Sequence, residues 1–331
     1  MKSERVPGPE ASEASEARSE APALPDEVLA QIFGLVTDGP TLLDVLPLVC
    51  QSWRRVARHP ASWAGVRFVI DTSGAFKRIM LQTDRARTLA RALLHAPVAA
   101  SLEVLGPSDP GPLLQSALRR SGASVRVLDC ACYSELFWKH VAPFLYRQRE
   151  LRVLRLRLRC RSHRATFEDM MTAEIKVPRC ARDKYDGELA GPHPKLRELV
   201  LQDLRVEHRL PERFVADLVH GAVALRQLDL DVHPVDADIF ETLEQPVVAV
   251  EHLSLVLKAK GPDAFWELRK SAGSAVALCR LMDPCLQSVT LHLHHQVSSD
   301  HPGDDWSLFC KGLFSAVASA LPDIKVTIED L

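Results

Sequence analysis

The chain of 331 residues contains no asparagine. N-linked glycosylation needs an Asn-x-Ser/Thr acceptor, so this modification is excluded. No run approaches the ~18 consecutive apolar residues of a transmembrane helix, and residues 1–23 lack the apolar core of a secretory signal. The eight cysteines are scattered along the chain, a distribution typical of free thiols in a reducing compartment. We therefore expect a cytoplasmic or nuclear protein that makes no membrane contact.

Neither sign of charge dominates the sequence. Lys and Arg number 41 against 43 Asp and Glu, which gives a net charge of -2. Because nucleic-acid-binding proteins rely on a strongly basic face, this balance predicts no nucleic-acid partner. With 47% hydrophobic residues, the chain is long enough for about two globular domains at the usual ~150 residues each.

The common catalytic and metal-binding motifs are also missing. None of G-x-G-x-x-G, G-x-x-x-x-G-K-[ST], G-x-S-x-G or H-E-x-x-H occurs. Cys130-x-Cys132 lacks the spacing of a zinc knuckle, and we interpret these cysteines as strand residues, one inward and one outward. His292 and His294 alternate along a predicted strand, where a solvated face is favoured over a metal site. The sequence predicts a protein that is not an enzyme and binds no cofactor or metal.

The composition changes abruptly at Leu24. Residues 1–23 consist largely of Ser, Glu, Ala and Pro, which predicts a disordered tail because almost nothing in it can be buried. Residues 24–63 are rich in apolar side chains and predict a first helix running to Val36. Positions 28, 32 and 35 form one apolar stripe of this helix and positions 29, 33 and 36 form another.

Two further helices are predicted in the same block. Thr41-Leu42-Leu43-Asp44 has the form of a capping box that opens a short helix, which Pro47 interrupts. A third helix is expected from about Leu48 to Ala57. Three short helices cannot hide this much apolar surface among themselves. Either a partner or the following domain must cover the excess, and the sequence leaves both alternatives open.

These residues resemble the F-box family. The resemblance rests on Leu24-Pro25-x-Glu27, Ile32-Phe33, Leu42-Leu43, Leu48-Val49-Cys50-x-x-Trp53-Arg54 and Pro60-x-x-Trp63, in this order and spacing. It implies that the three helices dock on a Skp-type adaptor, which connects to a cullin scaffold in a ubiquitin ligase of the SCF class. The adaptor contacts implied by the resemblance come from Leu24, Pro25, Ile32, Phe33, Leu43, Val49, Cys50 and Trp53.

The pattern L-x-x-L-x-L recurs through the rest of the chain. Complete copies begin at Leu151, Leu196 and Leu225, and looser copies begin at Leu102, Val125, Val250 and Leu286. Four of the six steps between copies measure 23 to 29 residues, and the longest step predicts an insertion near 160–195. Helical patterns lie between the copies, at 112–118, 135–146, 212–223, 264–282 and 308–320.

This alternation resembles leucine-rich repeats of irregular type. The resemblance implies an α/β fold in which a curved parallel sheet lies inside and helices lie outside. Because the Asn that closes each turn in that family is absent, Cys, Asp or backbone groups are expected to replace it. The predicted domains are the tail at 1–23, the helical module at 24–63 and the repeat solenoid at 64–331. A doubly wound open α/β sheet is the alternative fold.

Within each repeat, the residues between the leucines should point away from the core. Arg155, Arg157 and Arg159 then form a basic row, flanked by Asp129 on the preceding strand and Glu198 on the next. These charges either neutralise one another across the strands, or leave positive charge that binds an acidic or phosphorylated substrate. The hypothesised substrate surface consists of Arg155, Arg157, Arg159, Asp229, Asp231 and His292.

Two functions fit the sequence. The first is a non-catalytic substrate receptor of an SCF-type ubiquitin ligase, in which residues 24–63 bind the adaptor and the repeats bind a protein substrate. The second is a repeat scaffold that binds partners without ubiquitin and uses residues 24–63 as a cap. The sequence does not name the substrate, because recognition by a repeat surface depends on a few exposed side chains.

Overall fold

The structure is a computed structural model. It describes residues 24–72, 83–106, 110–132, 137–157, 193–202, 212–232, 250–260, 285–296 and 304–330, together with residues 273, 275–276, 278–279 and 282. Structural statements below concern these residues. The predicted tail at 1–23 and most of the insertion near 160–195 lie outside them.

The helical module consists of five short segments. They are α1 (Asp26–Phe33), η1 (Thr41–Val45), η2 (Leu46–Leu48), α2 (Gln51–Val56) and η3 (Pro60–Trp63). The first helix ends earlier than predicted, because Gly34 occupies its C-cap position. The third begins later than predicted, at Gln51, because the backbone of Cys50 is extended and its Sγ accepts the Trp53 amide at 3.5 Å.

The predicted capping box at Thr41 is wrong. The side chain that caps this segment is Asp38, whose Oδ2 accepts both the Thr41 amide at 3.1 Å and the Thr41 hydroxyl at 2.7 Å. Asp44, the expected second partner, instead accepts from Arg91 of helix α4 (Thr83–His95) at 2.9 Å. An ion pair with the following domain therefore takes the place of a local cap.

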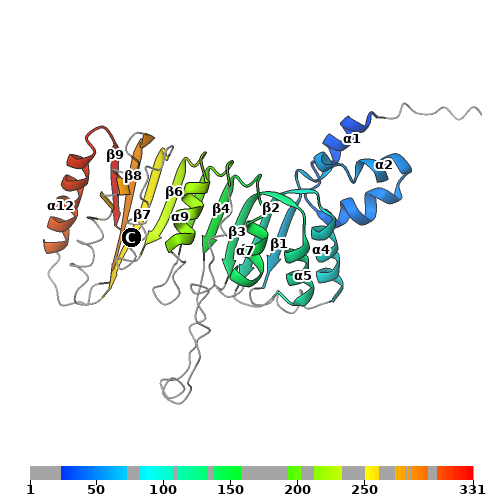
Figure 1. Ribbon diagram of the computed structural model, residues 1–331, viewed down its shortest axis with the longest axis horizontal. Helices are drawn as coiled ribbons and strands as arrows, with labels where there is room; N and C mark the ends of the chain where they lie inside the picture. Colours follow the sequence, from blue (N-terminus) through cyan, green and yellow to red (C-terminus); the bar gives the residue numbers. More distant parts are fainter. Residues whose placement is uncertain are drawn as a thin grey trace, which may run out of the picture.

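Nine parallel strands stand side by side in the order of the sequence (Figure 1). The strands are β1 (Arg67–Asp71), β2 (Val98–Gly106), β3 (Ser124–Cys132), β4 (Val153–Arg157), β5 (Glu198–Gln202), β6 (Gln227–Val232), β7 (His252–Lys260), β8 (Ser288–Gln296) and β9 (Lys325–Asp330). A doubly wound sheet reverses its strand order at a switch point, so that alternative is wrong. Each of the seven copies of the leucine pattern contributes a strand, whereas β1, β9 and α4 carry no such pattern and were not predicted.

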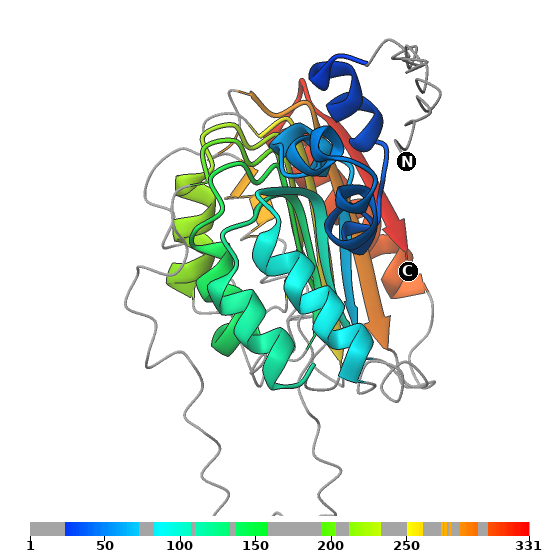
Figure 2. The same cartoon turned by 90° about the vertical axis from the view of Figure 1, so that its right-hand side faces the viewer.

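Helices connect successive strands. They include α4, α5 (Pro112–Arg120), η4 (Phe137–Val141) with α7 (Ala142–Leu145), α9 (Glu212–Gly221) and α12 (Asp304–Ala320). Seen along the sheet from its β1 end, α4 and α5 lie side by side on one face (Figure 2). The core lies between these helices and the inward strand residues, among which Leu128, Leu154 and Leu199 are fully buried. A parallel sheet in sequence order with helices on one face is the arrangement that the leucine pattern predicts.

Buried Ser, Gln and His side chains close the helix-to-strand turns. Ser121 Oγ donates to the Leu93 carbonyl at 2.8 Å and accepts the Ala123 amide at 3.1 Å. In the next turn, Gln148 Oε1 accepts the Val125 amide at 2.9 Å, and its Nε2 donates to the carbonyls of Ala123 and Phe144.

The following turn carries His193. Its Nδ1 donates to the Gln148 carbonyl at 2.8 Å, and the whole residue is buried. The positions just after the strands, where that family carries its Asn, lie mostly outside the described residues, so the expectation that Cys, Asp or backbone groups replace it stays a prediction. Ser, Gln and His can also satisfy buried backbone groups, since each carries a side-chain donor and acceptor.

The helical module and the sheet share one hydrophobic core. Phe33 and Trp63 belong to the same buried cluster as Phe68 of β1, and the Arg67 amide donates to the Thr37 carbonyl at 3.0 Å. Two backbone segments approach each other closely at Gly34 and Gly65, where a Cβ on Gly65 would overlap the carbonyl oxygen of Gly34. The module therefore covers the β1 end of the sheet.

Gly65→Ala should destabilise the protein by about 1–3 kcal/mol, because the added methyl group forces apart two backbone segments that have no room to move. Urea unfolding measures the change. Gly122→Ala is the matched control, since nothing lies within 4 Å of the position of its Cβ. Equal stability of the two variants would contradict the close contact.

Gln148→Ala should lower the free energy of unfolding by about 2–4 kcal/mol, because three backbone groups lose their buried side-chain partner. Gln287→Ala, at an exposed position before β8, should change it by no more than about 0.5 kcal/mol. Thermal or urea unfolding of both variants tests the role of Gln148, and similar small effects would argue against it.

Candidate functional site

One face of α1 is apolar and exposed. The buried face consists of Leu29, Ala30 and Phe33, whereas Val28 and Ile32 are 39% and 45% exposed, and Leu35 in the turn after the helix is 80% exposed. Positions 28, 32 and 35 follow one helical stripe. Of the two apolar stripes that the sequence indicates, the fold therefore buries one and leaves the other in solvent.

A second group of exposed apolar side chains lies between η2 and α2. Leu48 is 77% and Val49 is 58% exposed, and Leu24, just before α1, is exposed as well. A concentration of large exposed hydrophobic side chains on one small module is a feature of interaction surfaces. We call the set Leu24, Val28, Ile32, Leu35, Leu48 and Val49 the apolar surface of the module.

The structure divides the eight expected adaptor contacts into two groups. Leu24, Pro25, Ile32, Val49 and Cys50 are exposed. Leu43 and Trp53 are partly buried against the core, and Phe33 is only 2% exposed. The expectation that Phe33 lies on the contact face is therefore not met in this structure. Its ring packs edge-on against Trp53, with centroids 5.1 Å apart, and holds α1 against α2.

A polar contact fixes the other end of α1. Arg55 Nε donates to Asp26 Oδ2 at 2.8 Å, and Ser52 Oγ donates to Asp26 Oδ1 at 3.1 Å. The hydrogen bond from Arg55 is the main reason that the pKa of Asp26 is lowered. Together with the pair of aromatic rings, this contact sets the position of the exposed stripe of α1 relative to α2.

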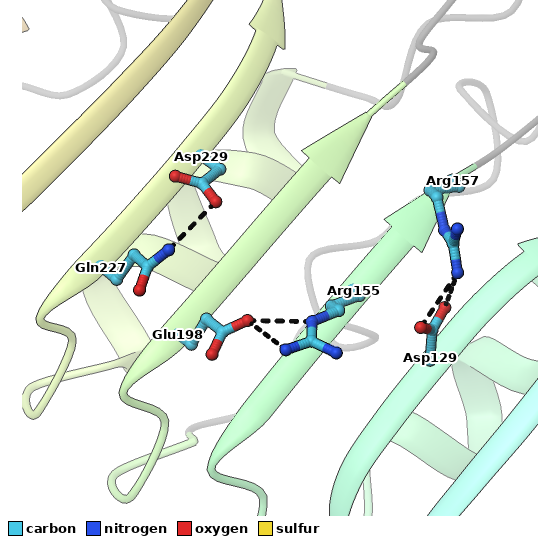
Figure 3. A network of polar contacts seen from close by, with 6 residues as sticks. All are labelled: Asp129, Arg155, Arg157, Glu198, Gln227 and Asp229. Atoms are coloured by element: carbon cyan, nitrogen blue, oxygen red, sulfur yellow. Dashed lines mark hydrogen bonds and ion pairs between the residues drawn. The ribbon is translucent and has the colours of Figure 1, made fainter. Parts of the chain in front are cut away.

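The outward face of the sheet carries the predicted basic row, but its charges are paired (Figure 3). Arg155 reaches Glu198 at 2.7 Å on one neighbouring strand, and Arg157 reaches Asp129 at 2.8 Å on the other. The hypothesis of mutual neutralisation is thus confirmed for these two arginines. Arg159, which would supply the surplus positive charge, lies outside the described residues.

The remaining residues of the hypothesised substrate surface lie beside other polar groups. Gln227 Nε2 donates to Asp229 at 3.2 Å. His292 Nδ1 lies 3.0 Å from a carboxylate oxygen of Glu329 without a hydrogen bond. Asp231 is buried. Burial is the largest cause of the raised pKa of Asp229, and the charge of Glu198 acts in the same direction. The sheet centre is thus a network of paired polar groups, not an open basic row.

Both cysteines of β3 face the core. Cys130 and Cys132 are two residues apart and therefore point the same way, and both are buried. The expectation of one inward and one outward thiol is wrong for this reason. Burial raises the pKa of Cys132 to about 12 and raises that of Cys130 as well. Neither thiol has the character of a nucleophile, which requires a lowered pKa.

Metal-binding and membrane-spanning features were also sought in the described segments. No group of three or more His, Cys, Asp or Glu side chains there has a geometry that could hold a metal ion. None of the helices in this part of the chain combines the length and the apolar character needed to cross a bilayer.

Comparison with known proteins identifies the helical module. The F-box-like family matches residues 21–68, a range that contains α1 to η3 and the start of β1. A search of curated proteins found no match to the chain. The chain therefore contains an F-box-like domain where the sequence resemblance predicted one.

Asp229→Asn should stabilise the protein more at pH 7 than at pH 3.5. A raised pKa in the folded state means that Asp229 contributes stability below its ordinary value of 3.8, and that this contribution is lost as the pH rises through the folded-state pKa. The Asn side chain keeps an oxygen that accepts from Gln227 but carries no charge. Urea unfolding of the variant and the native protein at the two pH values measures the stabilisation. Equal stabilisation at pH 3.5 and pH 7 would show that the pKa of Asp229 is not raised in the folded state.

Proposed function

We propose that this protein is the substrate-recognition subunit of an SCF-type ubiquitin ligase. In this proposal the F-box-like domain binds a Skp-type adaptor, which links the chain to a cullin scaffold. The repeats bind a protein substrate, and catalysis belongs to other subunits. The protein would work in the cytoplasm or nucleus without a cofactor.

The exposed stripe of α1 is the observation that carries this proposal. A helix that served only as a cap would need one apolar face, which Leu29 and Phe33 provide. Val28, Ile32 and Leu35 have no such role, because they remain exposed after the sheet end has been covered. Burying side chains of this kind stabilises by about 1.5–3 kcal/mol each when the burial is complete, so a partner that covers them gains substantial affinity.

We interpret the nine-stranded sheet as the substrate-binding part, built from leucine-rich repeats of irregular type. Its strands follow one another in parallel, and the inward leucines of successive repeats form one continuous core. Each repeat contacts mainly its neighbours, so residues at equivalent positions line up into long rows on the surface. Such rows suit recognition of an extended partner.

A scaffold without a ubiquitin function is the second candidate. It is favoured by the core that the helical module shares with β1, since terminal repeats require a cap. The two functions differ in what they expect of the apolar surface. A scaffold needs no adaptor, so in a scaffold Val28 and Ile32 would contact no adaptor.

The double variant Val28→Ser/Ile32→Ser should lower affinity for a Skp-type adaptor at least tenfold, because two apolar contacts are replaced by hydroxyl groups. Pull-down and calorimetric titration with the purified adaptor measure the effect. Because both side chains are exposed, the urea midpoint of the double variant should stay close to that of the native protein.

The matched control is Leu113→Ser/Phe314→Ser. It replaces two apolar side chains of similar exposure on α5 and α12, outside the F-box-like domain. The control should bind the adaptor normally. Absence of adaptor binding by the native chain would support the scaffold instead. Equal binding by both variants would show that the exposed stripe of α1 is not the adaptor contact.

A further inference from the structure

Four arginines occupy one register position on four neighbouring strands. Each follows a buried apolar residue that opens a repeat, and all four are exposed. The pairs Val127–Val153, Val153–Glu198 and Glu198–Gln227 fix the register one residue further along. We call these residues the arginine ladder: Arg126, Arg152, Arg197 and Arg226.

The backbone of the ladder is held by hydrogen bonds from strand to strand. The Arg152 amide donates to the Arg126 carbonyl at 2.8 Å, the Arg197 amide to the Arg152 carbonyl at 2.8 Å, and the Arg226 amide to the Arg197 carbonyl at 2.9 Å. Neighbouring strands lie ~4.8 Å apart, so the four positions extend over about 15 Å. Arg152, Arg197 and Arg226 directly precede β4, β5 and β6, and Arg126 is the third residue of β3, so the ladder lies at the edge of the sheet where these strands begin.

Acidic partners are scarce along this edge. Arg226 pairs with Glu251 at 3.4 Å, whereas Arg126, Arg152 and Arg197 make no ion pair with any described residue. The arginines of the neighbouring outward row behave differently, because Arg155 and Arg157 each hold a carboxylate. Like charges on adjacent strands repel and destabilise a sheet. Within the described part of the chain, the fold therefore leaves the guanidinium groups of Arg126, Arg152 and Arg197 without an ion-pair partner, an arrangement that its own packing does not require.

We propose that the arginine ladder binds a short acidic segment of the protein substrate. This inference rests on the proposed function, because it names the chemistry of the substrate that the repeats would receive. Guanidinium groups bind carboxylates through two parallel hydrogen bonds. The backbone hydrogen bonds fix the spacing of the four positions, so only the side chains have to be ordered on binding.

The ends of the ladder set the size of its ligand. Ala100 occupies the equivalent position on β2, and Glu251 occupies it on β7. The three arginines that have no ion-pair partner among the described residues therefore extend over about 10 Å, which matches about three residues of an extended peptide at 3.3 Å each. A nucleic acid would continue past this length onto Glu251, and the net charge of -2 provides no further attraction. The ladder fits an acidic peptide better than a polynucleotide.

Binding of a fluorescein-labelled peptide with five consecutive glutamates to the full chain tests the proposal. Fluorescence anisotropy at 50 mM salt should show binding that a peptide with five glutamines lacks. The variant Arg152→Glu/Arg197→Glu should bind the acidic peptide at least tenfold more weakly, and raising the salt to 200 mM should weaken binding to the native chain.

The control Arg87→Glu/Lys311→Glu changes the net charge equally on the exposed surfaces of α4 and α12, and should bind like the native chain. An equal loss in both variants, or no loss in the ladder variant, would overturn the proposal. The proposal would also be overturned if a labelled oligonucleotide of ten thymidines bound the native chain as tightly as the peptide and bound the ladder variant more weakly. Adaptor pull-down by the ladder variant tests the F-box-like domain separately, so failure of either idea is recognisable.

Discussion

The fold depends on the stacking of inward side chains from strand to strand. Leu128, Leu154, Leu199 and Leu228 occupy equivalent positions in four successive repeats and are fully buried. A single repeat has no way to bury its apolar face, so each one is stable only between neighbours. This requirement extends to the first strand, where residues of the helical module complete the core.

The helical module at the β1 end therefore has two apolar faces, one buried and one exposed. One face belongs to the shared core, and a pair of aromatic rings and the Asp26–Arg55 contact hold its helices together. The other face remains in solvent. The sequence left open whether a partner or the next domain covers the apolar excess. The core shared with the next domain buries one apolar stripe of α1, and the exposed stripe is what we assign to the adaptor.

Outside the core, position within the repeat decides how a charge is used. On β4, Arg155 and Arg157 lie between strands that carry carboxylates, and the charges neutralise one another. At the entrance to the same strand, Arg152 lies between two other arginines. The same residue type, arginine, thus stabilises the sheet in one row and, in our proposal, recognises the substrate in the other.

The sequence by itself determined the spacing of the repeats and the F-box-like block, because both depend on local patterns of apolar residues. It did not determine β1 or α4, which lack the leucine pattern and gain their places from packing. It also did not decide between the stripes of α1, since Ile32 and Phe33 are both apolar, and the packing of α2 and η3 against the helix buries only Phe33. The use of Gln148 as a turn-closing group, the pairing of Arg155 and the alignment of Arg152 with Arg197 were decided by tertiary structure, because each joins residues from different repeats.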